Sequence, residues 1–154
     1  MKNLTTYIIE KLKISKSKKP SYNYFPKTKK ELQDILKELI KERGNDGDFN
    51  DIDTSKITDM SNLFDGMPKF NGDISKWDVS NVTNMQSMFD YCKIFNKPLN
   101  DWDVSKVIDM TYMFCSCESF NQDISDWNVS NVKDMDFIFF NCPLEQKYVP
   151  KFKI

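Results

Sequence analysis

The 154-residue chain contains no histidine. This absence excludes Ser-His-Asp and Cys-His catalysis, histidine-ligated metal sites and an imidazole pH switch. The four glycines and six prolines are too few for a disordered or fibrous chain, and the hydrophobic content of 40% is enough for a core. Because the length is that of one ordinary domain, the sequence predicts a single folded body without most familiar hydrolase chemistry.

Long apolar runs are also missing. No stretch reaches the roughly 18 to 20 apolar residues that a membrane-spanning helix needs, so stable membrane insertion is not expected. The first ten residues, MKNLTTYIIE, lack the apolar region and cleavage site of a secretory signal. We therefore expect a cytoplasmic or virion-associated protein that reaches a cell surface only by a non-standard route. In such a setting the cysteines are expected to be free thiols, namely Cys92, Cys115, Cys117 and Cys142.

Arginine is nearly absent, since Arg43 is the only one. Residues 1–43 carry twelve basic and five acidic side chains, a net charge of +7, and residues 44–154 carry ten and eighteen, a net charge of −8. A basic segment can bind nucleic acid or an anionic membrane, but phosphate and base recognition favour the guanidinium group. The lysine-rich segment is therefore interpreted as a solvated surface.

The chain repeats itself with a period of 25 residues. Trp77, Trp102 and Trp127 are spaced at this interval. The positions that recur with them are Val79, Val104 and Val129; Val82, Val107 and Val132; Met85, Met110 and Met135; Met88, Met113 and Ile138; Phe89, Phe114 and Phe139; Cys92, Cys117 and Cys142; Phe70, Phe95 and Phe120; and Asn71, Asn96 and Asn121. An eroded earlier copy contains Ile52, Ser55, Ile57, Met60, Leu63 and Phe64. We call residues at one such position a column.

Each repeat combines two apolar patterns. The spacing Ile74-x-x-Trp77-x-Val79 predicts a short strand whose inward side chains include the tryptophan, and Val82 to Phe89 predicts one or two helical turns. A single unit buries too little apolar surface to fold alone, so copies must stack at about 4.8 Å with like residues above one another. The expected fold is an α/β repeat solenoid, a short right-handed leucine-rich-repeat-like coil of about 3.5 repeats over residues 45–145. Its predicted core contains Trp77, Trp102, Trp127, Met85, Met110, Met135, Phe89, Phe114, Phe139, Cys92, Cys117 and Cys142.

The unit F-N-x-x-I-x-x-W-[DN]-V-S-x-V-x-x-M-x-x-M-F-x-x-C resembles the BspA-type leucine-rich repeat family, also described as DUF285 or the bacterial surface protein 26-residue repeat. The resemblance covers about residues 49–145. It departs from the family pattern in its period and in its first copy, where Ile52 replaces tryptophan. The resemblance implies an adhesion or interaction module without catalytic residues.

Both ends of such a stack need a cover. Residues 28–44 predict a capping helix, with Thr28 and Glu31 as a capping box and Gly44 as the stop. Its apolar face comprises Leu32, Ile35, Leu36, Leu39 and Ile40. Residues 20–27 are expected to form an extended connector, and residues 146–154 are expected to form the opposite cap, through Tyr148, Val149, Phe152 and Ile154.

Residues 1–19 predict a short amphipathic helix with three alternative roles. It packs on the cap, binds a partner or membrane surface, or directs the chain to an assembly. The third role comes from a resemblance, because MKNLTTYIIE is similar to capsid-targeting segments of internal head proteins of large tailed phages, in which a site such as Ile8-Ile9-Glu10 is cut.

Polar columns mark the expected outer wall of the stack. Stacked carboxylates repel, by roughly a kilocalorie per mole per pair, unless something offsets the charge. Three interactions could compensate this repulsion: hydrogen bonds within Asp-x-Ser turns, a basic protein surface, or Ca²⁺. Nucleic acid is not expected on this wall, because its phosphates would meet carboxylates. The candidate protein-binding residues are Asp51, Asp53, Lys76, Asp78, Ser80, Asp101, Asp103, Ser105, Asp126, Asn128 and Ser130.

The carboxylates repeat along the chain instead of converging on one cleft, so an enzyme is not expected. The cysteines lack zinc-knuckle spacing, and no metal or cofactor is predicted. The first functional hypothesis is a non-catalytic protein-binding module, with an oligomeric state that the sequence leaves open. The rival is a structural or packaged virion component of a tailed phage, docked on the assembly through its N-terminal segment.

Overall fold

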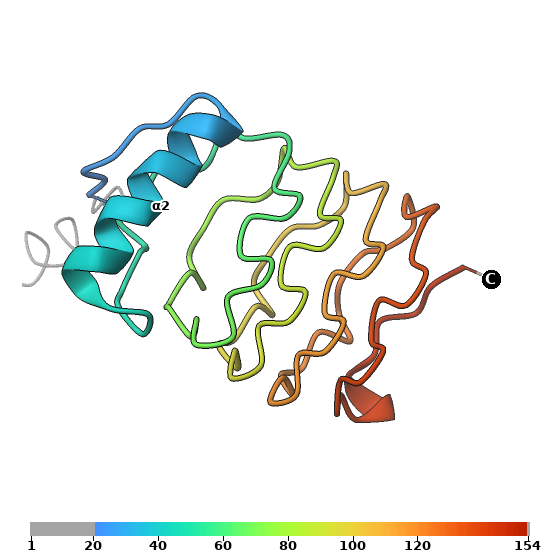
Figure 1. Ribbon diagram of the computed structural model, residues 1–154. Helices are drawn as coiled ribbons and strands as arrows, with labels where there is room; N and C mark the ends of the chain where they lie inside the picture. Colours follow the sequence, from blue (N-terminus) through green and yellow to red (C-terminus); the bar gives the residue numbers. More distant parts are fainter. Residues whose placement is uncertain (1–20, 154) are drawn as a thin grey trace, which may run out of the picture.

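The computed structural model describes residues 21–153. Helix α2, Lys29–Arg43, lies at one end, and the 25-residue copies follow it side by side toward the C-terminal end (Figure 1). A short 3₁₀ helix, η1, spans Gln146–Tyr148. The rest of the described chain consists of turns, bends and isolated parallel β-bridges. The fold is therefore compact and lacks a regular sheet, and an extended aromatic cluster forms its core.

The predicted helix is present, and its caps follow from the sequence. The Glu31 N–H donates to Thr28 Oγ1 at 3.2 Å, and the Glu31 carboxylate accepts from the Lys27 N–H at 2.7 Å, one residue earlier than in a standard capping box. Gly44 ends the helix in the left-handed region, with φ of 80°, and donates to the Ile40 carbonyl. Leu32, Leu36 and Leu39 are buried, so the apolar face of α2 packs on the first copy.

The predicted alternation of strand and helix within each repeat is wrong. Between residues 45 and 145 the described chain has neither a named strand nor a helix. The predicted helical turn is interrupted because two columns adopt the left-handed conformation, which a right-handed helix does not tolerate. The first column is Asn62, Ser87, Tyr112 and Phe137, with φ of 52–56°, and the second is Gly66, Tyr91, Ser116 and Asn141, with φ of 52–69°.

Backbone hydrogen bonds nevertheless join each copy to the next in register. Alternate N–H groups of one copy donate to carbonyls 24 residues ahead, as in Met85 to Asp109 (2.9 Å) and Phe89 to Met113 (3.0 Å). Parallel bridges connect Asp59, Asn84, Asp109 and Asp134 in succession. The bridges therefore lie just before the methionine column, and not in the predicted Trp77–Val79 segment. We call the bonds donated 24 residues ahead the donor ladder. Just before these donors in each copy, an N–H group donates back to the earlier copy, as in Ile108 to Thr83 (2.8 Å).

Aromatic rings form files along the stacking direction. Phe64, Phe89 and Phe114 are stacked with centroids 5.5 and 5.4 Å apart, and Trp102 and Trp127 are nearly parallel at 6.4 Å. The three tryptophans are 3–5% exposed, which confirms their predicted inward placement. Each indole N–H donates to a buried carbonyl 28 residues earlier, so burial leaves no indole donor unpaired. The predicted core members of the last copy, Met135, Phe139 and Cys142, are only half-buried.

Both flanking segments extend the pairing of the repeats. The connector forms a parallel bridge between Tyr24 and Ile52, so it is paired as well as extended. At the other end, the Glu145 N–H donates to Asn121 Oδ1 and the Tyr148 carbonyl accepts from Ile124. Phe152 is partly buried against the core. The tail thus covers the first half of the last copy, while Ile154 and the predicted helix in residues 1–19 lie outside the described residues.

Candidate functional site

The outward Asp-x-Ser column consists of locally hydrogen-bonded turns. In each copy the Oδ1 atom of the acidic or amide side chain accepts from the backbone N–H two residues later, at 3.0–3.2 Å. The four pairs are Asp53 with Ser55, Asp78 with Ser80, Asp103 with Ser105, and Asn128 with Ser130. The turn hydrogen bonds expected to compensate the repulsion between these side chains are therefore present. Because the fourth pair uses asparagine, the turn requires the carbonyl-type oxygen and not the charge.

These turns hold their carboxylates in a fixed orientation. Hydrogen bonds from the Ser105 hydroxyl and backbone lower the pKa of Asp103 below its usual value. The second carboxylate oxygens of Asp53, Asp78 and Asp103 accept no hydrogen bond from the rest of the described chain. The column, which we call the acidic ridge (Asp53, Asp78, Asp103 and Asn128), therefore presents fixed acceptors along one wall.

The neighbouring predicted column divides into two groups. Asp51 forms a bidentate ion pair with Arg43 at 2.7 and 3.1 Å. The Arg43 hydrogen bond lowers the pKa of Asp51, and Arg43 also bonds the Asp48 carbonyl. Asp51 thus joins α2 to the first copy. Its column mates Lys76, Asp101 and Asp126 are exposed beside the acidic ridge.

The cysteine column forms a ladder of its own. The thiols of Cys92 and Cys117 donate to the Phe64 and Phe89 carbonyls at 3.0 and 2.9 Å, and all four cysteines are free. Burial raises the pKa of Cys92 to about 12 and also raises that of Cys117. Within residues 21–153, no three His, Cys, Asp or Glu side chains are grouped so that they could hold a metal ion.

The buried thiols predict a stability that falls in alkali. An unfolded cysteine ionises near pH 8.5, whereas folded Cys92 stays protonated to about pH 12, so the folded state binds more protons in this window. The stabilising contribution is fully present below pH 8.5 and decreases by about 1.4 kcal/mol per pH unit above it. Urea unfolding at pH 8, 9 and 10 tests this. Cys92→Ala should flatten the profile, and parallel profiles for the two proteins would contradict the prediction.

Several exposed apolar side chains were not among the predicted site residues. Tyr91, Tyr112, Phe137 and Phe140 are 37–56% exposed. Tyr112 and Phe137 stack at 5.2 Å on the outside of the last two copies. These columns differ in residue type from copy to copy, so a search for recurring residues does not find them. The only signal in the sequence was that Tyr112 and Phe137 are aromatic where the earlier copies have Asn62 and Ser87.

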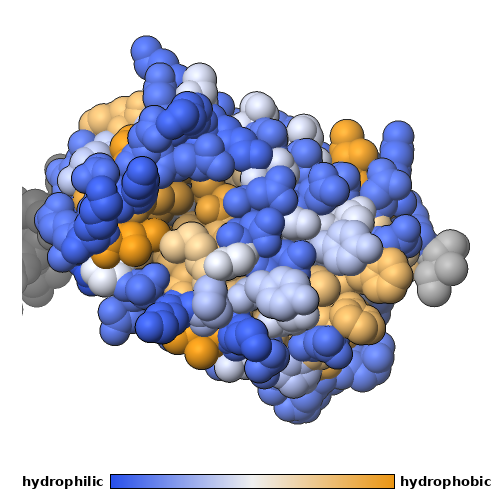
Figure 2. Space-filling model, viewed as in Figure 1, coloured by the Kyte–Doolittle hydropathy of each residue, from blue (hydrophilic) through white to orange (hydrophobic). Residues whose placement is uncertain are grey.

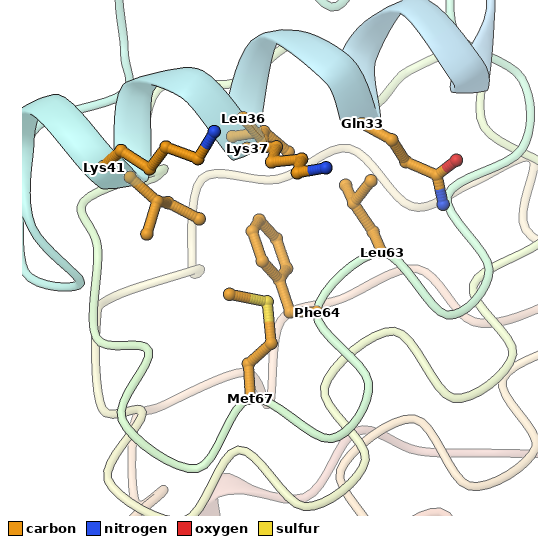
Figure 3. A pocket seen from close by; sticks show the side chains of 8 residues that line it. Gln33, Leu36, Lys37, Lys41, Leu63, Phe64 and Met67 are labelled. Atoms are coloured by element: carbon orange, nitrogen blue, oxygen red, sulfur yellow. The ribbon is translucent and has the colours of Figure 1, made fainter.

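An apolar groove runs along the contact between α2 and the first copy. Leu36, Ile40, Leu63, Phe64 and Met67 line it, and Lys37 and Lys41 form part of its rim (Figure 3). Its volume is about 350 Å³. Figure 2 shows apolar side chains gathered next to the largely hydrophilic surface of the helix. The groove lining includes the amines of Lys37 and Lys41 but no carboxylate, thiol or imidazole.

The family model described as "Mycoplasma protein of unknown function, DUF285" matches residues 30–152. The chain belongs to the DUF285 family. The DUF285 match confirms the resemblance and extends it beyond the repeats, since it includes most of α2 and the tail as far as Phe152. No curated protein and no solved structure matches this DUF285 chain. In its described part, none of the helices is both long and apolar enough to cross a membrane.

Proposed function

We propose that the DUF285 repeats form a right-handed solenoid and that the chain is a non-catalytic module that binds a basic protein surface through the acidic ridge. The register of the donor ladder and the aromatic files support the solenoid. A stack of this kind displays the same outward side chain at every copy, about 4.8 Å apart. Such a surface suits an extended partner better than a small substrate.

One observation carries the proposal. In the turns of Asp78 and Asp103, the Oδ1 atom is fixed by backbone N–H groups, and the second oxygen accepts no hydrogen bond from residues 21–153. Because the fold already holds these carboxylates in place, less side-chain entropy is lost when a partner binds. This favours association with lysine or arginine side chains. Exposed Asp101 and Asp126 add negative charge at the same wall.

A lysine-rich peptide of about 16 residues, with lysine at alternate positions, is the probe. We expect binding that weakens as salt is raised and a Kd at least tenfold higher for the Asp78→Asn, Asp103→Asn double variant. This variant should keep its fold, because Asn128 holds the same turn in the fourth copy. Fluorescence anisotropy at 50 and 300 mM NaCl measures both effects.

The matched control removes two negative charges at a distance from the acidic ridge. Asp34→Asn with Glu38→Asn removes the same two charges from exposed positions on α2 and should leave the Kd within about twofold. Equal losses in both double variants would mean that net charge alone attracts the peptide, which contradicts a specific ridge. A Ca²⁺ titration is run in parallel. If the chain binds Ca²⁺ and the ridge variant does not, the ligand of the ridge is Ca²⁺ and not a protein.

The alternative of a packaged virion component depends on residues 1–19. These lie outside the described residues, and no observation of residues 21–153 favours it.

A further inference from the structure

The last copy ends the donor ladder with unpaired donors. In the three ladder steps before it, N–H groups at equivalent positions find a carbonyl in the next copy, as in Met110 to Asp134 (2.8 Å) and Phe114 to Ile138 (2.9 Å). Within residues 21–153, the corresponding N–H groups of Met135, Phe137, Phe139 and Asn141 have no hydrogen-bond partner. A row of unpaired backbone groups is a template for pairing with another chain.

The same end leaves core side chains partly uncovered. Met85, Met110, Phe89 and Phe114 are fully buried, whereas their counterparts Met135 and Phe139 are half-buried. Phe137 and Phe140 are 56% and 53% exposed next to them. Within residues 21–153, the hydrogen bonds between the tail and the last copy are at Asn121 and Ile124. We call the bare part, Val132 to Asn141, the open edge.

The polarity of the open edge selects its occupant. Each open edge has four unpaired N–H groups and one counterpart of the acceptors Thr83 and Ile108, the Lys133 carbonyl. Two open edges brought together would oppose mainly N–H groups to N–H groups, so a symmetric dimer leaves most of them unpaired. The matching acceptor edge of a second copy is occupied by α2, which buries Leu32, Leu36 and Leu39 in the core and whose Lys29 Nζ bonds Ser61 Oγ at 2.6 Å. A second copy of this chain with its helix in place therefore does not fit either.

We propose that the open edge binds a repeat segment of a different polypeptide, one that lies parallel to it and directs alternate backbone carbonyls at it. The internal steps define what this segment carries: four carbonyls at every second residue, and apolar side chains in the order of Val107, Met110, Met113 and Phe114. An aromatic at the Tyr112 position stacks on Phe137, as Tyr112 itself does at 5.2 Å. The mode is strand addition, in which main-chain bonds provide affinity and side-chain columns provide specificity. This surface is separate from the acidic ridge, so the two proposals can fail independently.

A synthetic peptide with the sequence of residues 100–124 is the probe, labelled with fluorescein and kept reduced. We expect saturable binding to the full chain, and slower amide hydrogen exchange at Met135, Phe137, Phe139 and Asn141 in its presence. Amides of α2 should exchange at unchanged rates. A peptide of the same composition in scrambled order should leave all these rates unchanged.

The variant Phe137→Asn removes the exposed ring and suits the left-handed backbone at this position, where φ is 53°. We expect the Kd for the peptide to rise at least tenfold, with Phe25→Asn, which alters a 63% exposed ring near α2, as the matched control. Binding of the lysine-rich probe should be unaffected by Phe137→Asn. Unchanged exchange at saturating peptide, or equal peptide affinity in both variants, would overturn the proposal. So would a dimer in which these four amides become protected without peptide.

Discussion

Replacing Phe89 by alanine will lower the free energy of unfolding by about 3 to 5 kcal/mol. Phe89 is fully buried and stacks with four rings: Phe95 at 4.4 Å, Phe114 at 5.4 Å, Phe64 at 5.5 Å and Trp102 at 6.3 Å. Removing the ring leaves a cavity whose walls belong to three successive copies, so the backbone cannot close it without breaking the register. Urea unfolding followed by tryptophan fluorescence measures the loss.

The matched control is Phe139→Ala, the same substitution at the same column in the last copy. Phe139 is half-buried, and among the rings of residues 21–153 it pairs with Phe114 alone, at 5.9 Å. Its loss should therefore cost about 1 to 2 kcal/mol, since the area removed from water is smaller. Equal costs at the two positions would mean that the rings do not form one continuous core.

The second large effect is expected at Gly72. A methyl group added here would lie 2.6 Å from Phe49 Cδ2 and 2.9 Å from Phe70 Cε2, well inside van der Waals contact. Gly72→Ala should therefore cost about 1 to 3 kcal/mol, the range seen when a packed core is overfilled. The equivalent positions in later copies carry Lys97 and Gln122, so the repeat itself does not require glycine there.

Phe49 explains the difference, because it occupies the column of Ile74, Leu99 and Ile124 with a larger side chain. The double variant Gly72→Ala, Phe49→Leu should recover part of the stability lost in Gly72→Ala. The cycle needs Phe49→Leu alone as its fourth member, and a coupling energy of about 1 kcal/mol or more is expected for residues in contact. Strict additivity would show that the clash with Phe49 is not the cause.

The sequence predicted the features that repeat or that obey local capping rules. The 25-residue columns identified the buried tryptophans, and Thr28 and Gly44 located the ends of α2 within a residue. The Asp-x-Ser spacing indicated the turns of the acidic ridge. Each of these depends on interactions that are local in sequence or identical in every copy.

The backbone path between the columns could not be predicted, for a physical reason. The positions that interrupt the expected helical turn carry Ser87, Tyr112 and Phe137, and none of these residue types signals a left-handed conformation. Neighbouring copies impose it through the donor ladder, so the cause is non-local. The open edge was missed for a similar reason, because periodicity predicts burial for every copy alike and does not report which copy lacks a neighbour.

The one-way direction of the donor ladder bears on how such a chain can change in length. Every internal copy makes the same bonds to the copies on both sides of it: the donor ladder runs toward the later copy, and N–H groups such as that of Ile108 donate back to the earlier copy. Helix α2 bonds the first copy and the tail bonds the last one. Duplicating one 25-residue unit in frame would reproduce the same joints on both sides and leave α2 and the tail as they are. Gain or loss of whole units therefore preserves the contacts between copies. Insertion of a single residue would instead shift every column beyond it.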